Sequence, residues 1–146
     1  MTYVRIIILI GIIIGILLFK KTKPNFSKGL LIGFVLSLGI SFFGTELSKT
    51  ISFLSFGILT FIFSVYSGIN KKWLNLIIGL FAFVSFFFKS MHFPYGSELE
   101  LSMIIPIIVY LVILGKDKFK NKQLSILTIL IVYELTDFLK LITKWF

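Results

Sequence analysis

The chain alternates between long apolar runs and short polar interruptions. Each run has about the length of a bilayer-spanning helix, because about 20 apolar residues cross the hydrocarbon core. The pattern therefore predicts an all-α, polytopic membrane protein in which one six-helix transmembrane bundle occupies residues 1–146. The predicted spans are approximately 3–19, 29–47, 51–69, 73–90, 99–115 and 124–146.

Two alternatives to six full spans stay open. The second and third runs are short and meet at Gly44-Thr45-Glu46, so they also fit one re-entrant hairpin. In the last run only Leu124–Tyr133 is uninterrupted, so that run also fits an interfacial helix, which would leave five spans. The first run resembles a signal peptide, but it ends in lysines without a small-residue cleavage site. We therefore expect it to be retained as a span.

Composition supports lipid as the solvent. The chain is 58% hydrophobic and 14% charged, whereas soluble domains are about one quarter charged. A soluble fold of this size could not bury so much apolar surface in one core. The absence of cysteine excludes disulfides, thiol catalysis and thiolate-held metals or clusters.

The charges separate between the two ends of the predicted bundle. The connections at 20–28, 70–72 and 115–123 hold ten lysines and one acid, Asp117, for a net charge of +9. The opposite half holds five basic and five acidic residues. The positive-inside rule places the lysine-rich end in the cytoplasm and both termini outside. Membrane topology thus accounts for the excess positive charge. We therefore expect no nucleic-acid partner.

Small residues recur at helix-packing spacing in the first two runs. Gly11 and Gly15 form a GxxxG motif, and a second stripe follows at intervals of four residues: Gly29, Gly33, Ser37 and Ser41. Small residues allow membrane helices to approach closely. The pattern favours packing within the chain, with a homo-oligomer interface as the alternative.

The last run carries the most unusual chemistry. Glu134, Asp137 and Lys140 recur every three residues, which places them on one face of a helix. A carboxylate at bilayer depth is costly and must face protein, water or a cation. The residues therefore form a candidate proton or ion relay. The alternatives are an ion-pair stripe facing the bundle and the wet face of an interfacial helix.

The connection between the fourth and fifth runs is the second candidate site. Lys89, His92 and Glu98 share the outer half of the membrane with Glu46 and Glu134 in the predicted topology. Together these groups could line an outward-facing crevice, although a lone histidine beside carboxylates is more often a structural residue. The sequence contains no recognisable catalytic motif. We therefore expect no catalytic residues, no cofactor and no metal.

The segment Phe88-Lys89-Ser90-Met91-His92-Phe93-Pro94-Tyr95-Gly96 carries a limited resemblance to a known family. It resembles the F-K-x-x-H-x-P-G connection in the membrane hairpin of the gliding-motility and type IX secretion motor subunit GldL. Small membrane proteins of the Bacteroidota carry similar hairpins. The resemblance covers residues 73–115 and implies a bacterial inner-membrane protein with a periplasmic connection. Tyr95 is an insertion, and no acid follows Glu100 in the next run. Proton-driven motor function is therefore not implied.

These observations favour a non-enzymatic integral membrane subunit or accessory protein. The alternative is a small transporter or proton-conducting protein that uses Glu134 and Asp137. An outer-leaflet crevice for lipids or small molecules is a third possibility. The expected partners are the lipid bilayer and either other membrane subunits or further copies of this chain.

Overall fold

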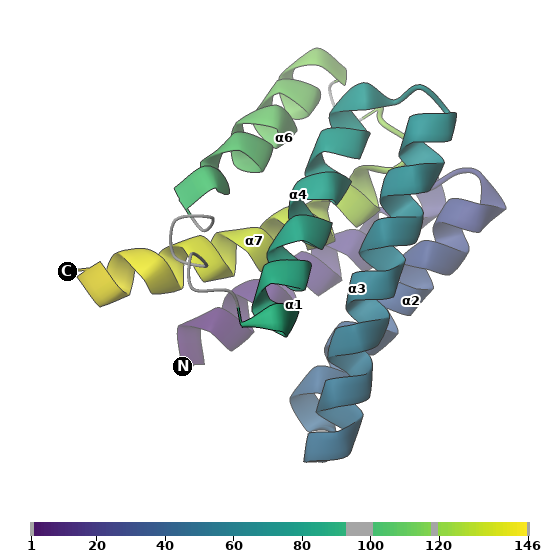
Figure 1. Cartoon of the computed structure of the whole chain (residues 1–146). Coiled ribbons are helices and arrows are strands. Elements are labelled where there is room, and N and C mark those ends of the chain that lie inside the picture. The colour runs from purple at the N-terminus through teal and green to yellow at the C-terminus, as the bar shows by residue number, and fades with distance from the viewer. Residues whose placement is uncertain (1, 93–100, 118–119, 146) are drawn as a thin grey trace.

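The apolar runs form the helices of a computed structural model, which describes residues 2–92, 101–117 and 120–145. In chain order they are α1 (Thr2–Leu17), the short 3₁₀ helix η1 (Phe19–Lys21), α2 (Asn25–Phe43), α3 (Glu46–Ile69), α4 (Trp73–Met91), α6 (Ile104–Asp117) and α7 (Leu124–Trp145). Figure 1 shows their arrangement. The part of the chain that the structure describes is all-helical.

The helix boundaries follow the polar interruptions but differ from several expected ranges, because α2 begins at Asn25 and not at residue 29, and α3 begins at Glu46 and not at residue 51. The second helix was expected to reach residue 47, but α2 ends at Phe43. Gly44 is extended, and the Thr45 hydroxyl caps α3 by accepting a hydrogen bond from the Ser48 N–H. A capped N-terminus stabilises a new helix at this point. The interruption is therefore a tight turn between two helices.

The helices form two antiparallel groups. In one group, α1 packs along α7, because Gly11 faces Val132 and Gly15 faces Ile129. In the other group, α2, α3 and α4 run down, up and down in the view of Figure 1. Their contacts include an edge-to-face pair of Phe34 and Phe56 with ring centroids 5.3 Å apart. The two groups meet where α7 contacts α4 and α2, and α6 packs against both α4 and α7.

The three lysine-rich connections lie together at one end of the bundle. The Lys23 N–H donates to the Lys122 carbonyl at 3.1 Å, which links the first connection to the last. The Asn75 side chain donates to Gln123 at 2.7 Å, which links the start of α4 to the start of α7. Both chain termini lie at the opposite end (Figure 1).

Among the residues that the structure describes, three helices are long and apolar enough to cross a membrane: α2, α3 and α4. Helix α7 has 22 residues but carries charged side chains. Helices α1 and α6 have 16 and 14 residues, or about 24 and 21 Å, against a hydrocarbon thickness of about 30 Å. Much of the outer surface is apolar and includes exposed Ile13, Leu36 and Ile58. This surface is compatible with a membrane protein.

Candidate functional site

A cluster of charged side chains lies between α4 and α7. The Lys89 ammonium of α4 donates to Asp137 Oδ2 of α7. Lys140, one turn further along α7, donates to Asp137 Oδ1 at 3.0 Å. Asp137 is only 6% exposed, so both oxygens of a buried carboxylate bind lysine.

Two neighbours on α7 complete this charge cluster, which consists of Lys89, Tyr133, Glu134, Asp137 and Lys140. The Lys89 ammonium lies over the Tyr133 ring, 5.1 Å from its centroid. Glu134 precedes Asp137 by one turn of α7 and is completely buried. The site thus combines two buried acids, Glu134 and Asp137, with the partly exposed Lys89 and the exposed Lys140.

The register between α4 and α7 explains why these side chains meet. Asn75 and Gln123 pair at the lysine-rich end of the two helices. Lys89 follows Asn75 by the same number of residues as Asp137 follows Gln123. Because the helices run in the same direction, one register aligns both pairs, about 21 Å apart along the helices. The two polar pairs fasten α4 to α7 near both ends of their contact.

The arrangement can hold charge inside the bundle, but its geometry favours fixed pairing. Buried ions are tolerated when partners and hydrogen bonds replace lost hydration. A shift in the register between α4 and α7 would separate the partners and leave a buried charge uncompensated, which is costly. The same groups could exchange protons only if water or a second acceptor reached them.

A small cavity lies beside the charge cluster, between α2, α3 and α7. It has a volume of about 120 Å³, and its polar lining consists of Ser37, Ser41, Ser52 and Tyr133. Neither Glu134 nor Asp137 lines this cavity. The Tyr133 ring lines this cavity and packs against Phe56 at a centroid distance of 4.6 Å.

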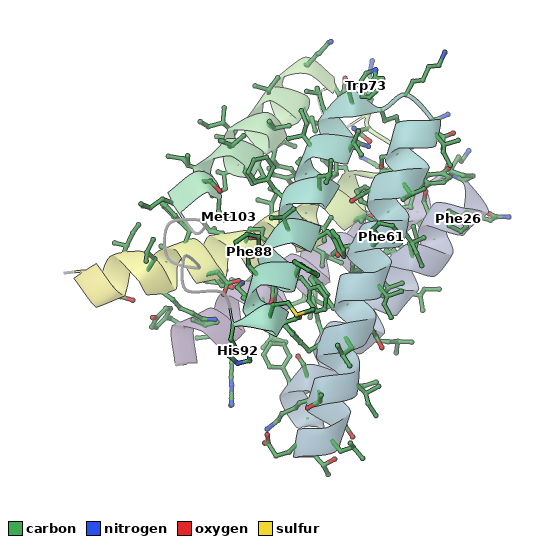
Figure 2. The ribbon with its side chains drawn as sticks, in the orientation of Figure 1. Phe26, Phe61, Trp73, Phe88, His92 and Met103 are labelled. Atoms are coloured by element: carbon green, nitrogen blue, oxygen red, sulfur yellow. The ribbon has the colours of Figure 1, made fainter. Side chains whose placement is uncertain are left out.

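The structure separates the remaining predicted site residues from the charge cluster. Glu46 is exposed at the turn between α2 and α3, where it pairs with Lys49 at 2.7 Å. His92 is exposed and ends α4 with a left-handed backbone conformation, φ 51°. Trp73 and His92 mark the two ends of α4 (Figure 2). Glu98, Glu100 and Phe93–Gly96 lie outside the described residues, so the expected outer crevice has no structural description.

The predicted packing residues differ in their surroundings. Gly11 and Gly15 lie against α7, and an added Cβ at Gly33 would lie 3.0 Å from Leu59. Ser37 is buried, and Ser41 donates to the Leu38 carbonyl at 2.6 Å. Gly29 has open space around it, with no atom within 4 Å of an added Cβ. The GxxxG motif therefore packs within the chain.

A polar network at the lysine-rich end was missed by the sequence analysis. Gln123 is fully buried, accepts from Asn75 and donates to Ser27 at 3.2 Å. Thr22 and Ser125 pair their hydroxyls at 2.6 Å. The available signal was the presence of amide and hydroxyl residues at the starts of α2, α4 and α7. Such residues usually cap helices, so their pairing between helices was not evident.

No family model, no curated protein and no solved structure matches this chain. Within residues 2–92, 101–117 and 120–145, no three His, Cys, Asp or Glu side chains gather closely enough to hold a metal ion. The interpretation of the site therefore depends on its own geometry.

Proposed function

We propose that this protein is a non-enzymatic subunit or accessory protein of a bacterial inner membrane. In this proposal six helices cross the bilayer, the lysine-rich end lies in the cytoplasm, and both termini lie in the periplasm. The charge cluster fixes α7 against α4, and the bundle presents its outer surface to lipid and to partner subunits.

The observation that carries this proposal is the buried pairing of Asp137 with Lys89 and Lys140. A structural pin requires charges that are paired and shielded from water, whereas a relay requires a wet path to them. The 6% exposure of Asp137 and the enclosed position of Glu134 favour the pin. Their burial also removes the main objection to α7 as a span, because the costly carboxylates face protein and not lipid.

The proposed topology draws support from the shared location of the lysine-rich connections. Successive helices run in alternating directions, so the connections after α1, α3 and α6 reach the same end. An excess of lysine on one side is typical of the cytoplasmic face. With η1, the first helical segment extends from Thr2 to Lys21, which brings it close to the length of a tilted span.

The natural absence of cysteine makes the topology testable by accessibility labelling. Single cysteines replace Lys20, Leu47, His92 or Lys122 in an otherwise unchanged chain. An impermeant thiol reagent added to intact cells should label Leu47→Cys and His92→Cys, and it should reach Lys20→Cys and Lys122→Cys only after lysis. Labelling of His92→Cys and Lys122→Cys in the same compartment would refute the topology.

The subunit role is tested by affinity purification from the native membrane under mild detergent. We expect a distinct set of membrane proteins to copurify in constant proportion. A variant that combines Lys89→Met, Glu134→Gln and Asp137→Asn serves as the matched control. It removes the charges that, in this proposal, hold α4 and α7 in register. Recovery of the wild-type protein alone, at unchanged yield, would contradict the role.

Proton conduction is the second candidate, because Glu134 is a fully buried acid near the middle of α7. A liposome flux assay compares the wild type with Glu134→Gln and with Glu46→Gln, a neutralised exposed carboxylate. The proposal expects no flux above empty liposomes from any of the three. Flux that Glu134→Gln abolishes and Glu46→Gln retains would replace the accessory role with transport.

A further inference from the structure

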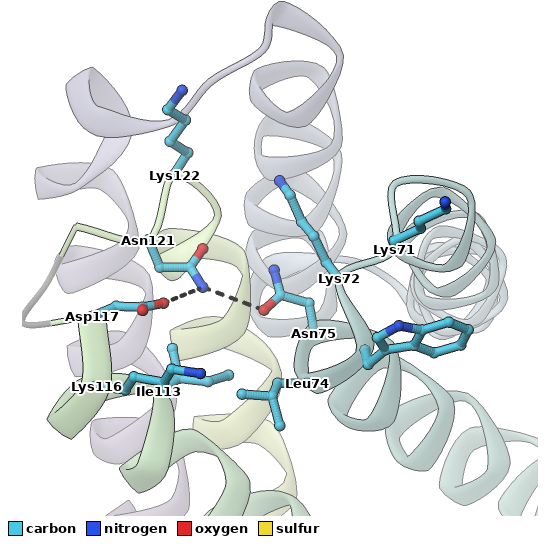
Figure 3. Close-up of a pocket in the computed structure, with 10 residues that line it drawn as sticks. Lys71, Lys72, Leu74, Asn75, Ile113, Lys116, Asp117, Asn121 and Lys122 are labelled. Carbon is cyan, nitrogen blue, oxygen red and sulfur yellow. Dashed lines mark hydrogen bonds between the residues drawn. The ribbon is translucent and has the colours of Figure 1, made fainter.

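A large pocket opens at the lysine-rich end, between the α3–α4 connection and the α6–α7 connection. Its volume is about 570 Å³, within the range of small-molecule sites. Its lining comprises Lys71, Lys72, Trp73, Leu74, Asn75, Ile113, Lys116, Asp117, Asn121 and Lys122. In Figure 3 the residues of the two connections face each other across the pocket.

The pocket is strongly cationic. Four lysines line it against the single acid Asp117. The Asp117 carboxylate accepts a hydrogen bond from Asn121 at 3.4 Å, and Asn121 also donates to Asn75 at 3.3 Å (Figure 3). None of the four lysines forms an ion pair with a carboxylate in the part of the chain that the structure describes.

The positive charge of Lys72 is disfavoured in this pocket. Lys72 is partly buried, and this burial, together with the neighbouring charge of Lys122, lowers the pKa of Lys72 below its ordinary value. A bound anion would relieve both effects, because it solvates the ammonium groups and screens their repulsion. The same pocket receives the N-terminus of α4, which no side chain caps. The helix dipole therefore adds positive potential.

The pocket also has an apolar side. Leu74, which is half-buried, contributes hydrocarbon to its lining, with fully buried Ile113 behind it. Trp73 is 64% exposed next to them, and tryptophan is enriched at the headgroup level of membranes. A purely polar anion would leave this apolar surface uncovered, whereas a lipid would cover it with the first carbons of its acyl chains.

We propose that this pocket binds the phosphate headgroup of an anionic phospholipid from the cytoplasmic leaflet. Lys72 and Lys122 contact the phosphate from the two connections, and the acyl chains leave the pocket along Leu74 and Trp73. Basic pockets between membrane helices are suited to such headgroups. This inference rests on the proposed function for the orientation of the lysine-rich end toward the cytoplasm.

The test measures lipid retention by the purified full-length protein. The protein is placed in nanodiscs of phosphatidylcholine containing a minority of phosphatidylglycerol, and copurifying lipids are counted by native mass spectrometry. The pocket variant combines Lys72→Gln with Lys122→Gln. The matched control combines Lys20→Gln with Lys21→Gln, which removes the same charge from exposed positions at the same end of the bundle.

We expect the wild type and the control to retain phosphatidylglycerol in preference to phosphatidylcholine, and the pocket variant to bind it about tenfold more weakly, because each lysine near an anionic surface contributes appreciably to attraction. If all three proteins retain phosphatidylglycerol equally, the attraction is a diffuse one between lysines and anionic lipid. That result would overturn the proposed lipid site. Melting temperatures in pure phosphatidylcholine establish that the pocket variant is folded.

A second arm separates a lipid from free phosphate. Inorganic phosphate at roughly 10 mM should not displace the lipid, because it gains nothing from the apolar side of the pocket. Displacement at that concentration would overturn the lipid assignment. Both nanodisc leaflets have the same composition, so the lipid result does not depend on orientation. Cysteine labelling therefore tests the proposed topology independently.

Discussion

Replacement of Lys89 by methionine tests whether the charge cluster is a buried structural pin. Methionine retains most of the length of the side chain but removes the ammonium that binds Asp137. The substitution leaves two buried carboxylates with Lys140 as the remaining cation. That lysine is 54% exposed in its side chain, so it cannot replace the buried partner.

Two independent scales give the same expected loss. Removal of one partner from a buried ion pair costs about 3–5 kcal/mol in soluble proteins. An acid at the centre of a bilayer helix costs about 2.5–3.5 kcal/mol on insertion scales. The Lys89 side chain is 27% exposed, so its ammonium is not fully desolvated and the lower values apply. We therefore expect Lys89→Met to lower the free energy of unfolding by about 3 kcal/mol.

The assay measures the free energy of reversible unfolding in bicelles, and steric trapping reports the unfolded fraction. A triple variant distinguishes lost charge from lost packing, because Glu134→Gln and Asp137→Asn remove the charges that Lys89→Met leaves behind. We expect this triple variant to recover at least half of the loss. Lys49→Met, at the exposed pair with Glu46, is the control and should have no measurable effect.

Either of two results would refute this account. One is a Lys89→Met protein within about 0.5 kcal/mol of the wild type, the usual scale of surface substitutions. The other is a triple variant no more stable than Lys89→Met. Each would indicate that water already solvates the carboxylates, as a relay requires.

Three further predictions concern the packing and the lysine-rich end. An alanine Cβ at Gly57 would lie 2.1 Å from a phenylalanine ring of α4, so Gly57→Ala should cost about 1–3 kcal/mol in the same unfolding assay. Gly29→Ala, in open space, should leave stability unchanged or raise it, and equal losses at both positions would contradict the helix pairing. Gln123→Ala should cost about 1–3 kcal/mol because it leaves buried Asn75 without this partner, and a double-mutant cycle with Asn75→Ala should be strongly non-additive. Lys72→Met should leave the melting temperature in phosphatidylcholine unchanged or raise it, since folding disfavours this charge; a lower value would argue against the crowding of the lysines.

The sequence alone determines the local architecture of this protein. The apolar runs form helices because a helix satisfies its backbone hydrogen bonds within its own segment, although the fifth run is interrupted at Met103 before α6 begins. Polar residues end the helices, although the boundary at Phe43 depended on a cap at Thr45 that hydropathy does not weigh. The spacing of Glu134 and Asp137 likewise fixed their common face before any fold was known.

Only the tertiary structure decided which helices meet. The spacing along α7 gives the face of Asp137 but does not reveal that its partner is Lys89 on α4. The pairing of Asn75 with Gln123 and the pocket between two lysine-rich connections also join residues that are distant in the chain. A helix forms its backbone hydrogen bonds within its own segment. Which helices become its neighbours depends on how the side chains of all helices pack together. The sequence pattern of one segment therefore specifies a face, and the assembled bundle specifies what that face contacts.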